Sequence, residues 1–502
     1  MIETSRLDAL FEPNGVIVAG ASPHPGRFGT VALHNLLRSG YRGRVFATSR
    51  EGGEIMGVPT VLSVDELPDG AADLVLVCTP HSVNVELLHA CGRKGVKAAF
   101  VAAAGYAEAG EEGQRWELEL IEAAEEAGIL LAGPNGQGLV STPAQLCAQI
   151  VAPFPPAGSI GVASQSGNLS SAFMNYAKQT GVGLSRAVSV GNGPVVTVLD
   201  YLDYYAQDEA TSTCLAYMES VPDAEHFIAR VKAITARKPL VVLKGGVTAA
   251  GQRAATSHTG ALASDDVVFS AACRQAGITR VDSVEEAFEV AATFATQPLP
   301  TGPNVVVLTT AGGVGVLTAD AIAETSLRLV PLADDLRAGI DALLPPRWSK
   351  NNPVDTAAGE TRDTVPALMQ LIAEHEFVDA MIFLGIGIQS NQGEMMKTGE
   401  FYPEHGLERI VEYHERQDRR YAEAAASISE ATGKPILIAT ELAQTMPDNP
   451  GPAVVRQTGR FCYPSSIRAV RALDHAYRYR RYLDSRRSPS ADRAARTLMH
   501  EH

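Results

Sequence analysis

The feature that most constrains the fold is a repeated alternation of short apolar runs with segments typical of helices. Between Gly15 and Gly138, the runs GVIVAG, RVFATS, DLVLVCTP, KAAFVAAAG and ILLAGPN alternate with helical segments around residues 31–38, 83–92 and 113–127. Apolar strands separated by helices predict a parallel sheet whose two faces are covered. The sequence therefore predicts an α/β fold.

Two more series of the same kind follow. The stiff segment PFPPAG (153–158) precedes SIGVASQSG, LSRAVSVGNG, TCLAYMES, PLVVLKGG and ITRVDS, and QPLPTGPN (297–304) precedes NVVVLTTAGGVG, LRLVPL, NNPVDT, DAMIFLGIG and PILIAT. A chain of 502 residues also exceeds what one hydrophobic core supports. We expect three α/β domains and an Arg-rich tail that is mobile or contacts a partner, with the bounds 1–152, 153–298, 299–473 and 474–502.

Composition excludes several classes of function. Lys and Arg number 42 against 57 Asp and Glu, and the net charge of −15 disfavours nucleic acid and anionic membranes as partners. The six Cys residues lie far apart without a metal-binding spacing, so we expect buried thiols and no metal site. No N-terminal leader and no run of about 18 apolar residues is visible. A soluble cytoplasmic protein is expected.

A Gly-rich turn follows the first apolar strand, between Gly20 and Gly29. Such a turn lets backbone approach a ligand and opens a helix N-terminus that accepts phosphate, although a plain tight turn explains it equally well. It is not the G-x-G-x-x-G fingerprint, and the second strand ends at Ser49-Arg50 without the acidic residue that holds a ribose. This argues against a nicotinamide cofactor and for a ligand with an additional phosphate, which Arg50 could face.

A second candidate turn is Ser164-Gln165-Ser166-Gly167, between a strand and a helix. Small hydroxyl residues and Gly at a helix start present free backbone N–H groups to an anion. A simple Ser N-cap with a turn Gly explains the same residues.

The most informative segment is SHTGALAS, which carries His258. The ring follows a Gly- and Ala-rich stretch in which it would be accessible. A lone His is more often structural than catalytic, and this chain has 12 of them. However, Glu219 ends the apolar strand TCLAYM, and a carboxylate there can orient an imidazole through one nitrogen while the other stays nucleophilic.

Two other Gly-containing loops, residues 189–194 and 310–315, suit anions or close backbone approach, and ordinary turn chemistry explains both as well.

Taken in order, these segments resemble the α-subunits of NDP-forming acyl-CoA synthetases, relatives of succinyl-CoA synthetase, over about residues 10–475. The resemblance is carried by GAS-x-x-PG-x-x-G at the first turn, GPN, SQSG, GN, Y-x-E, KP, K-x-G, SHTG-x-LA, GG and NPVD, the segments that begin at Gly20, Gly133, Ser164, Gly191, Tyr217, Lys238, Lys244, Ser257, Gly312 and Asn352. It implies a Rossmann-like CoA-binding domain followed by two flavodoxin-like α/β domains.

The resemblance also implies a mechanism. An acyl phosphate forms, CoA displaces phosphate, and a phosphohistidine, here His258 oriented by Glu219, carries the phosphoryl group to or from the nucleotide. The turn from Ser164 to Gly167 would stabilise its charge. CoA would be bound by Gly20, Ser22, Arg27, Gly29, Ser49 and Arg50, and the acyl substrate by Asn135, Gly136, Gly191 and Asn192.

The partners follow from the same resemblance. The family binds ATP or GTP with Mg²⁺ on an ATP-grasp unit, which this sequence lacks, so we expect a separate β-subunit and an assembly such as α2β2.

Departures from the family pattern concern the pockets. Ser49-Arg50 replaces the usual end of V-N-P, and Gly136 stands where a Cys is common after G-P-N. With Gly193 to Val195, Gly136 points to an acyl group other than acetate or succinate.

Two alternatives to the ligase remain open from the sequence. One is a CoA- or acyl-CoA-sensing regulator on the same scaffold, which would not need both His258 and Glu219. The other is a nicotinamide-dependent oxidoreductase, disfavoured by the missing fingerprint and ribose acid.

Overall fold

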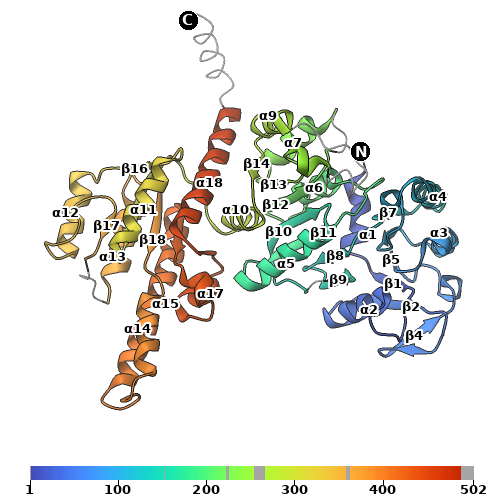
Figure 1. Cartoon of the computed structure of the whole chain (residues 1–502), viewed down its shortest axis with the longest axis horizontal. Helices are drawn as coiled ribbons and strands as arrows, with labels where there is room; N and C mark the ends of the chain where they lie inside the picture. The colour runs from blue at the N-terminus through green and yellow to red at the C-terminus, as the bar shows by residue number, and fades with distance from the viewer. Residues whose placement is uncertain (1, 152, 222–224, 254–265, 358–361, 488–502) are drawn as a thin grey trace, which may run out of the picture. The chain divides into compact units, whose positions relative to one another are not determined.

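The computed structural model describes residues 2–487 except for 152, 222–224, 254–265 and 358–361. Two compact units are formed, one by Met1–Gln179 with Gly183–Ala291 and the other by Thr180–Val182 with Ala292–His502. The described residues of these units form three sheets, two in the first unit and one in the second (Figure 1).

The first sheet has seven strands in the order β3-β4-β2-β1-β5-β6-β7, parallel except for the short pair β3 and β4. Its central strands are buried throughout, as expected of a parallel sheet covered on both faces. The strands are β1 (Gly15–Ala19), β2 (Arg44–Thr48), β3 (Glu54–Ile55), β4 (Val58–Val61), β5 (Leu74–Val77), β6 (Ala98–Val101) and β7 (Leu130–Ala132). The associated helices are α1 (Asp8–Phe11), α2 (Phe28–Arg38), α3 (Asn84–Arg93) and α4 (Glu111–Glu126), with 3-10 turns at Thr4–Leu7, Val64–Glu66, His81–Val83 and Ala107–Ala109.

The second sheet also has seven strands, in the order β14-β13-β12-β10-β11-β8-β9. It consists of β8 (Gly138–Ser141), β9 (Leu146–Gln149), β10 (Ala157–Ser164), β11 (Leu184–Ser189), β12 (Thr213–Met218), β13 (Leu240–Lys244) and β14 (Thr279–Val281), with helices α5 (Gly167–Thr180), α6 (Val198–Gln207), α7 (Phe227–Thr235), α9 (Asp266–Ala276) and α10 (Val284–Thr296). Strands β8 and β9 precede residue 153, where the sequence places the second domain, yet β8 pairs antiparallel with β11. The domain boundaries stay a prediction.

One hydrophobic core joins the two sheets of the first unit. At its centre, the ring of Phe11 stacks on Tyr204 at 5.3 Å between centroids and meets Tyr201 and Tyr205 at 6.0 and 5.9 Å. Beside this ring, Nε of the buried Arg186 forms an ion pair with Oδ2 of Asp208 at 3.2 Å. The two sheets of the first unit therefore pack around one shared core.

The second unit contains a six-stranded parallel sheet in the order β16-β15-β18-β19-β20, with β17 beside β15. Its strands are β15 (Asn304–Thr309), β16 (Arg328–Leu329), β17 (Val354–Asp355), β18 (Ala380–Leu384), β19 (Ile436–Ala439) and β20 (Cys462–Tyr463). Its helices are α11 (Gly312–Ala323), α12 (Asp334–Leu343), α13 (Thr364–Glu374), α14 (Ile388–Lys397), α15 (Leu407–Thr432), α16 (Leu442–Thr445), α17 (Pro450–Gln457) and α18 (Ser466–Arg487). The parallel α/β fold class predicted from the sequence is confirmed.

The expectation that the tail from residue 474 is mobile is wrong for its described part, and the alternative that it contacts a partner stays a prediction. Helix α18 continues to Arg487 and packs against α11, with Ala476 and Tyr479 buried. Asp474 is also buried and accepts a hydrogen bond from the backbone N–H of Ser326 at 3.0 Å. Because this segment is rich in arginine, the sequence does not readily indicate the apolar residues that pack the helix into the core.

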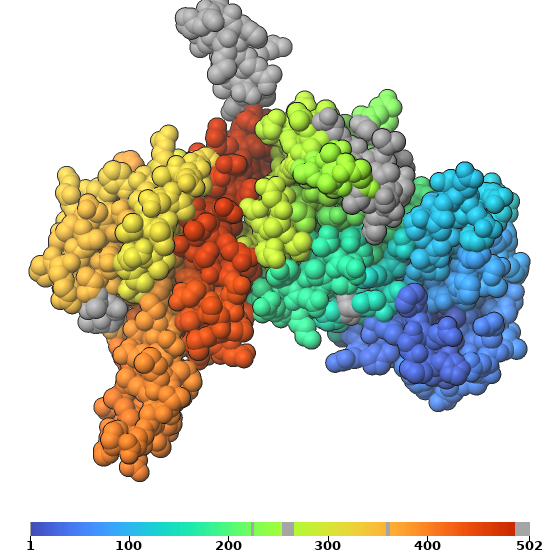
Figure 2. Space-filling view, viewed as in Figure 1, coloured from blue at the N-terminus to red at the C-terminus, as the bar shows by residue number. Residues whose placement is uncertain are grey.

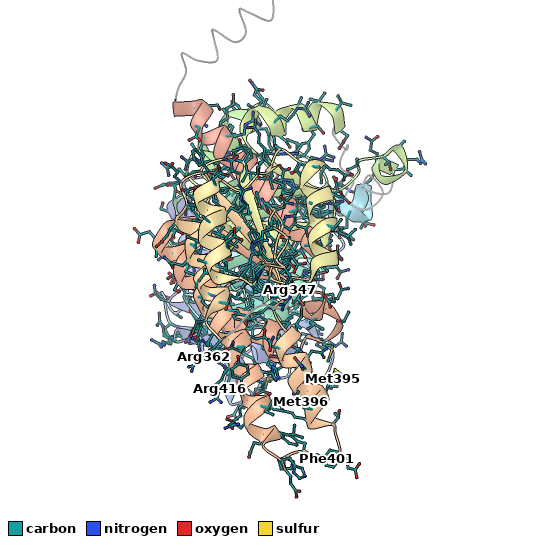
Figure 3. The ribbon with its side chains drawn as sticks, turned by 90° about the vertical axis from the view of Figure 1, so that its left-hand side faces the viewer. Arg347, Arg362, Met395, Met396, Phe401 and Arg416 are labelled. Atoms are coloured by element: carbon teal, nitrogen blue, oxygen red, sulfur yellow. The ribbon has the colours of Figure 1, made fainter. Side chains whose placement is uncertain are left out.

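Helices α14 and α15 extend beyond the sheet of the second unit, and Figure 2 shows their orange ends standing out from the rest of that unit. Met395 and Phe401, labelled near this end in Figure 3, are 70% and 62% exposed. No described helix has both the length and the hydropathy needed to cross a bilayer. All six cysteines are free, and all but Cys78 are buried, as the sequence predicts.

Candidate active site

The Gly-rich turn lies at the carboxyl edge of the first sheet, between β1 and α2. Gly20 has a φ of +86°, and the N–H of Ala21 donates to the carbonyl of Thr48 at 2.9 Å. A Cβ on Gly29 would lie 2.1 Å from the carbonyl oxygen of Gly20. Only glycine therefore lets the first turn of α2 approach the strand end this closely.

The other residues predicted to bind CoA surround this turn. Because β1 and β2 are paired, Ser49 and Arg50 follow the strand directly beside it. Ser49 is buried, whereas Arg50 and Arg27 are exposed. The half-buried Ser22 accepts a hydrogen bond through its carbonyl from the Thr30 hydroxyl at 2.6 Å. The structure thus brings all six of these residues to one edge, with two guanidinium groups open to solvent.

The SQSG turn lies at the carboxyl edge of the second sheet, between β10 and α5. The hydroxyl of Ser164 donates to the carbonyl of Ser166 at 2.6 Å and accepts from its N–H at 3.2 Å. The hydroxyl of Ser166 accepts from the N–H of Leu169 at 3.4 Å, which caps the helix. The amides of Gly167 and its neighbour stand in the first helical turn, where no intrahelical acceptor exists.

Gln165 joins this turn to the predicted orienting carboxylate. Its Oε1 accepts from the backbone N–H of Glu219 at 2.6 Å and of Ser220 at 3.2 Å. Glu219 is only 6% exposed, and its carboxylate accepts from the Tyr217 hydroxyl at 3.1 Å. The phosphate-binding and orienting residues predicted from the sequence are therefore held together by direct hydrogen bonds.

A buried lysine completes this edge. Nζ of Lys244 donates to the carbonyl oxygens of Glu219 at 3.1 Å and Gly245 at 2.6 Å. Burial lowers the pKa of Lys244. Burial also raises the pKa of Tyr217, and the nearby charge of Glu219 raises it further. The positive charge of Lys244 thus lies within the strand-end region that would hold a phosphoryl group.

The two loops predicted to bind the acyl group contact each other. A Cβ on Gly191, whose φ is +66°, would lie 2.1 Å from the carbonyl oxygen of Pro134. The N–H of Asn192 donates to that oxygen at 2.9 Å, and Nδ2 of Asn135 donates to Oδ1 of Asn192 at 3.3 Å. These loops follow β7 of the first sheet and β11 of the second, so they connect the two edges.

Gly136 is closely surrounded. A Cβ there would lie 2.5 Å from the carbonyl oxygen of Ser189 and 2.6 Å from the Phe100 ring. The next residue, Gln137, bonds its amide to both Ser171 at 2.8 Å and Asn168 at 3.2 Å. Only glycine therefore fits at position 136, in the segment that connects the GPN loop to Gln137 and, through the Gln137 side chain, to the start of α5.

Two carboxylates of this region, those of Glu108 and Glu117, are not predicted from the sequence. Nδ2 of Asn192 lies 2.7 Å from both Oε2 of Glu108 and Oε2 of Glu117. They were overlooked because they belong to a Glu-rich stretch typical of a solvated helix. The detectable signal was the position of Glu108, in the loop after β6, on the same sheet edge as the GPN loop.

His258 and its SHTG segment lie outside the described residues, between Arg253 and Asp266. The structure therefore gives no position for the predicted phosphohistidine.

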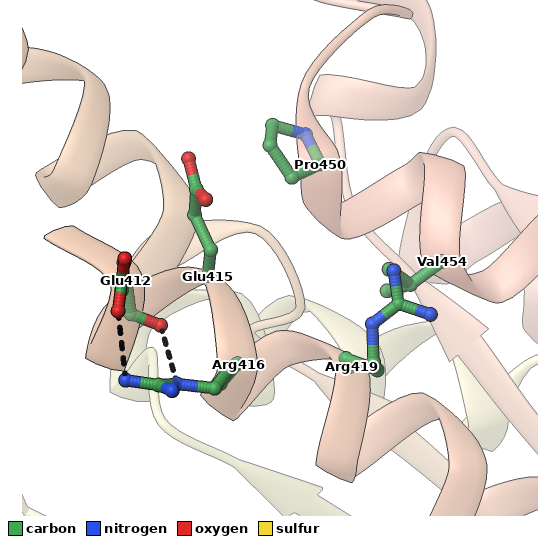
Figure 4. Close-up of a pocket in the computed structure, with 6 residues that line it drawn as sticks. All are labelled: Glu412, Glu415, Arg416, Arg419, Pro450 and Val454. Atoms are coloured by element: carbon green, nitrogen blue, oxygen red, sulfur yellow. Dashed lines mark hydrogen bonds and ion pairs between the residues drawn. The ribbon is translucent and has the colours of Figure 1, made fainter.

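A separate pocket in the second unit contains none of the predicted site residues. Glu412, Glu415, Arg416, Arg419, Pro450 and Val454 line it, and Arg416 bonds to Glu412 within α15 (Figure 4). Glu415 pairs with Lys397 and Arg419 with Glu423, both outside this lining, so its four charged residues already have ion-pair partners in α14 or α15.

Comparison with known proteins agrees with this arrangement. Residues 14–142 match a CoA binding domain, residues 157–294 a succinyl-CoA ligase like flavodoxin domain, and residues 305–387 a ligase-CoA domain. The α-subunit of the ADP-forming acetate–CoA ligase I of Pyrococcus furiosus is 33% identical over 481 residues, which cover 95% of this chain and 98% of that subunit. The chain belongs to the family of ADP-forming acyl-CoA synthetase α-subunits.

Two further relatives differ in how much of their own length this chain matches. The ADP-forming acetate–CoA ligase I of Archaeoglobus fulgidus is 36% identical over 394 residues, and this match covers 78% of the present chain but 56% of that longer protein. A solved acetyl-coenzyme A synthetase 1 of Ca. Korarchaeum cryptofilum, in complex with phosphate and ADP, superposes with a TM-score of 0.81 at 28% identity, covering 95% of this chain and 98% of that one. The relatives support the ligase over the sensing regulator.

Proposed function

We propose that this α-subunit converts a carboxylic acid, CoA and NTP into acyl-CoA, NDP and phosphate through an acyl phosphate and a phosphohistidine at His258. The observation that carries the proposal is the hydrogen-bonded row along the second sheet, in which Gln165 links the SQSG turn to Glu219. Preorganised amides and a buried carboxylate suit a dianionic phosphoryl group that moves on and off an imidazole.

We propose that the reaction proceeds in three steps. The imidazole of His258 takes the γ-phosphoryl group of NTP and releases NDP. The substrate carboxylate then attacks that phosphorus, which frees the imidazole and gives the acyl phosphate. The CoA thiolate attacks the acyl carbon, the thioester forms, and inorganic phosphate leaves. Glu219 orients the imidazole, and the first turn of α5 stabilises the phosphoryl charge.

The CoA site is assigned to the edge of the first sheet. Gly20 and Gly29 allow close backbone approach, and the exposed Arg27 and Arg50 offer cations to the phosphates of CoA. The proposed CoA site lies where the strand order reverses between β1 and β5, the usual ligand position in such sheets. Asn135, Gly136, Gly191 and Asn192 are assigned to the acyl group, between this edge and the phosphoryl site.

NTP and Mg²⁺ are assigned to an ATP-grasp β-subunit, with an assembly such as α2β2. Support comes from the Archaeoglobus protein, because this chain matches only 56% of its length and the remainder would correspond to a separate subunit here. The expected location is the cytoplasm, where CoA and NTP are supplied together.

The test separates the relay from the partner. The chain alone is incubated with ³²P-labelled acetyl phosphate, and the chain with an ATP-grasp partner is incubated with γ-labelled ATP and Mg²⁺. We expect an acid-labile, base-stable label that is lost in His258→Ala and kept in His34→Ala, whose His is exposed on α2. No label from either donor, with CoA still bound, would refute the ligase and favour the sensing regulator.

A further inference from the structure

The amide of Asn192 is held by more groups than a turn requires. Both hydrogens of its Nδ2 are donated, one to Glu108 and one to Glu117, each at 2.7 Å. An amide nitrogen has only two hydrogens, so neither remains for a ligand. Because the nitrogen must face the two carboxylates, the amide oxygen must face Asn135, from whose Nδ2 it accepts.

Glu108 is itself fixed by backbone groups. Its Oε1 accepts from the N–H of Gly105 at 2.5 Å and of Tyr106 at 3.2 Å, which leaves Oε2 for Asn192. Burial opposes ionisation of this carboxyl, but the hydrogen bonds from Asn192 and these amides outweigh it and lower the pKa of Glu108. One oxygen of the Glu108 carboxylate therefore accepts from backbone amides, and the other accepts from Asn192.

Asn135 is the last member of this chain of contacts. Its backbone is in the left-handed region, with φ +62°, and its N–H donates to the carbonyl of Ala103 at 3.0 Å. Within the described part of the molecule, Asn192 is the side chain that bonds its amide, so the second N–H and the oxygen of that amide stay available.

We propose that Glu108 is a positioning residue of the acyl site, acting through Asn192 to orient the amide of Asn135 toward the acyl group. Glu117 assists by taking the second hydrogen of Asn192. This inference rests on the proposed function, because it requires that the acyl group lie at Asn135. Asn192 then acts on the substrate only through Asn135.

The two glutamates differ in a way that can be tested. Glu108 uses both oxygens as acceptors, and a glutamine has only one acceptor oxygen, so Glu108→Gln must leave either Asn192 or the Gly105 and Tyr106 amides unpaired. Glu117 uses the single atom Oε2 for Asn192 and for the N–H of Ala107 at 3.4 Å. Glu117→Gln can keep both bonds.

The measurement is isothermal titration of the purified chain with CoA and with acetyl-CoA, the simplest probe that carries the acyl carbonyl common to every acyl substrate. We expect Glu108→Gln to weaken acetyl-CoA binding about tenfold, as loss of a hydrogen bond to a charged group predicts, and to change CoA binding less than about twofold. Glu117→Gln should weaken acetyl-CoA less than about threefold. Glu119→Gln, an exposed position on the same helix α4, is the matched control.

A triple variant tests the polarity directly. Glu108→Gln, Glu117→Gln and Asn192→Asp together reverse donor and acceptor in the two contacts of residue 192 with residues 108 and 117, while residue 192 still accepts from Asn135. Acetyl-CoA affinity should recover to within about threefold of the wild type, whereas the two Gln substitutions without Asn192→Asp should not recover. With the ATP-grasp partner present, Glu108→Gln should raise KM for the acid and leave labelling of His258 by ATP unchanged.

Failure of the positioning role and failure of the proposed function would give different binding results. Equal acetyl-CoA affinity in Glu108→Gln and wild type, or no recovery in the triple variant with an unchanged unfolding midpoint, would overturn the positioning role alone. If the wild-type chain bound neither CoA nor acetyl-CoA, the proposed function would fail, and the positioning role with it.

Discussion

The carboxyl edges of the two sheets in the first unit differ in how their polar residues are held. On the first sheet, Arg27 and Arg50 are exposed, and Phe28 at the start of α2 is 49% exposed. On the second sheet, Ser164, Glu219 and Lys244 are 0%, 6% and 5% exposed, and each takes part in hydrogen bonds within the SQSG turn or between the strand ends beside it.

This difference fits two kinds of task. A large ligand that arrives from solvent and leaves again needs an accessible edge with cations at its rim. Transfer of a phosphoryl group needs donors that are already oriented before the charge moves, in a site that excludes water. The two edges therefore suit binding and chemistry, respectively, and the two loops proposed to bind the acyl group join them through Asn135 and Asn192.

The largest expected effect tests whether the second sheet depends on buried charge. Arg230 on α7 is 7% exposed and pairs with Asp200 at 2.7 Å and Asp203 at 2.6 Å. Arg230→Met should lower the free energy of unfolding by about 3–5 kcal/mol, because it leaves carboxylates buried without their cation. The measurement is urea unfolding of the full chain.

The control for this change lies beside the first sheet. Arg93 on α3 pairs with Asp65 and Glu86 at the surface, at 2.9 and 3.0 Å. Arg93→Met should leave the unfolding midpoint unchanged, because exposed ion pairs contribute little. Equal losses in the two variants would show that the contrast between the sheets is not one of buried charge.

The next effect concerns turnover. Glu219→Gln keeps an oxygen for the Tyr217 hydroxyl and the backbone bond to Gln165, but removes the charge that would orient His258. We expect kcat to fall about a hundredfold with little change in KM for CoA. Glu225→Gln, at an exposed position in the same loop region, should keep full activity. A loss smaller than threefold for Glu219→Gln would remove this residue from the relay.

Much of this arrangement was predictable, because the determining patterns are local. Buried runs such as GVIVA and LVVLK specify strands, and the turns after them place Gly20, Ser164 and Glu219 at sheet edges. The rest depends on contacts between distant segments. Glu108 lies 84 residues from Asn192 in the chain, and nothing in its Glu-rich surroundings indicates their hydrogen bond. Strand β8 likewise joins the second sheet through a pairing that local sequence does not encode.

A smaller effect sharpens the assignment of CoA to the first sheet. A Cβ at Gly29 would collide with the backbone of Gly20, whereas one at Gly26, with φ +77°, meets nothing within 4 Å. Gly29→Ala should raise Kd for CoA about tenfold by shifting the start of α2. Gly26→Ala should cost only about 1 kcal/mol of stability from its backbone conformation. If titration calorimetry shows the same Kd for CoA in both variants, CoA binding does not depend on the close approach of Gly29 to Gly20.

The smallest effect uses pH at the junction of the two edges. The pKa of Glu108 lies below its ordinary value of 4.5 in the folded chain. The unfolded chain therefore binds more protons between the two pKa values, so the stabilisation is complete above 4.5 and is lost as pH falls through the folded value. The difference in free energy of unfolding between wild type and Glu108→Gln should shrink on acidification in this window, since a protonated Glu108 resembles glutamine. Glu119→Gln should show no such trend, and a difference that is constant with pH would mean that the charge of Glu108 does not hold Asn192.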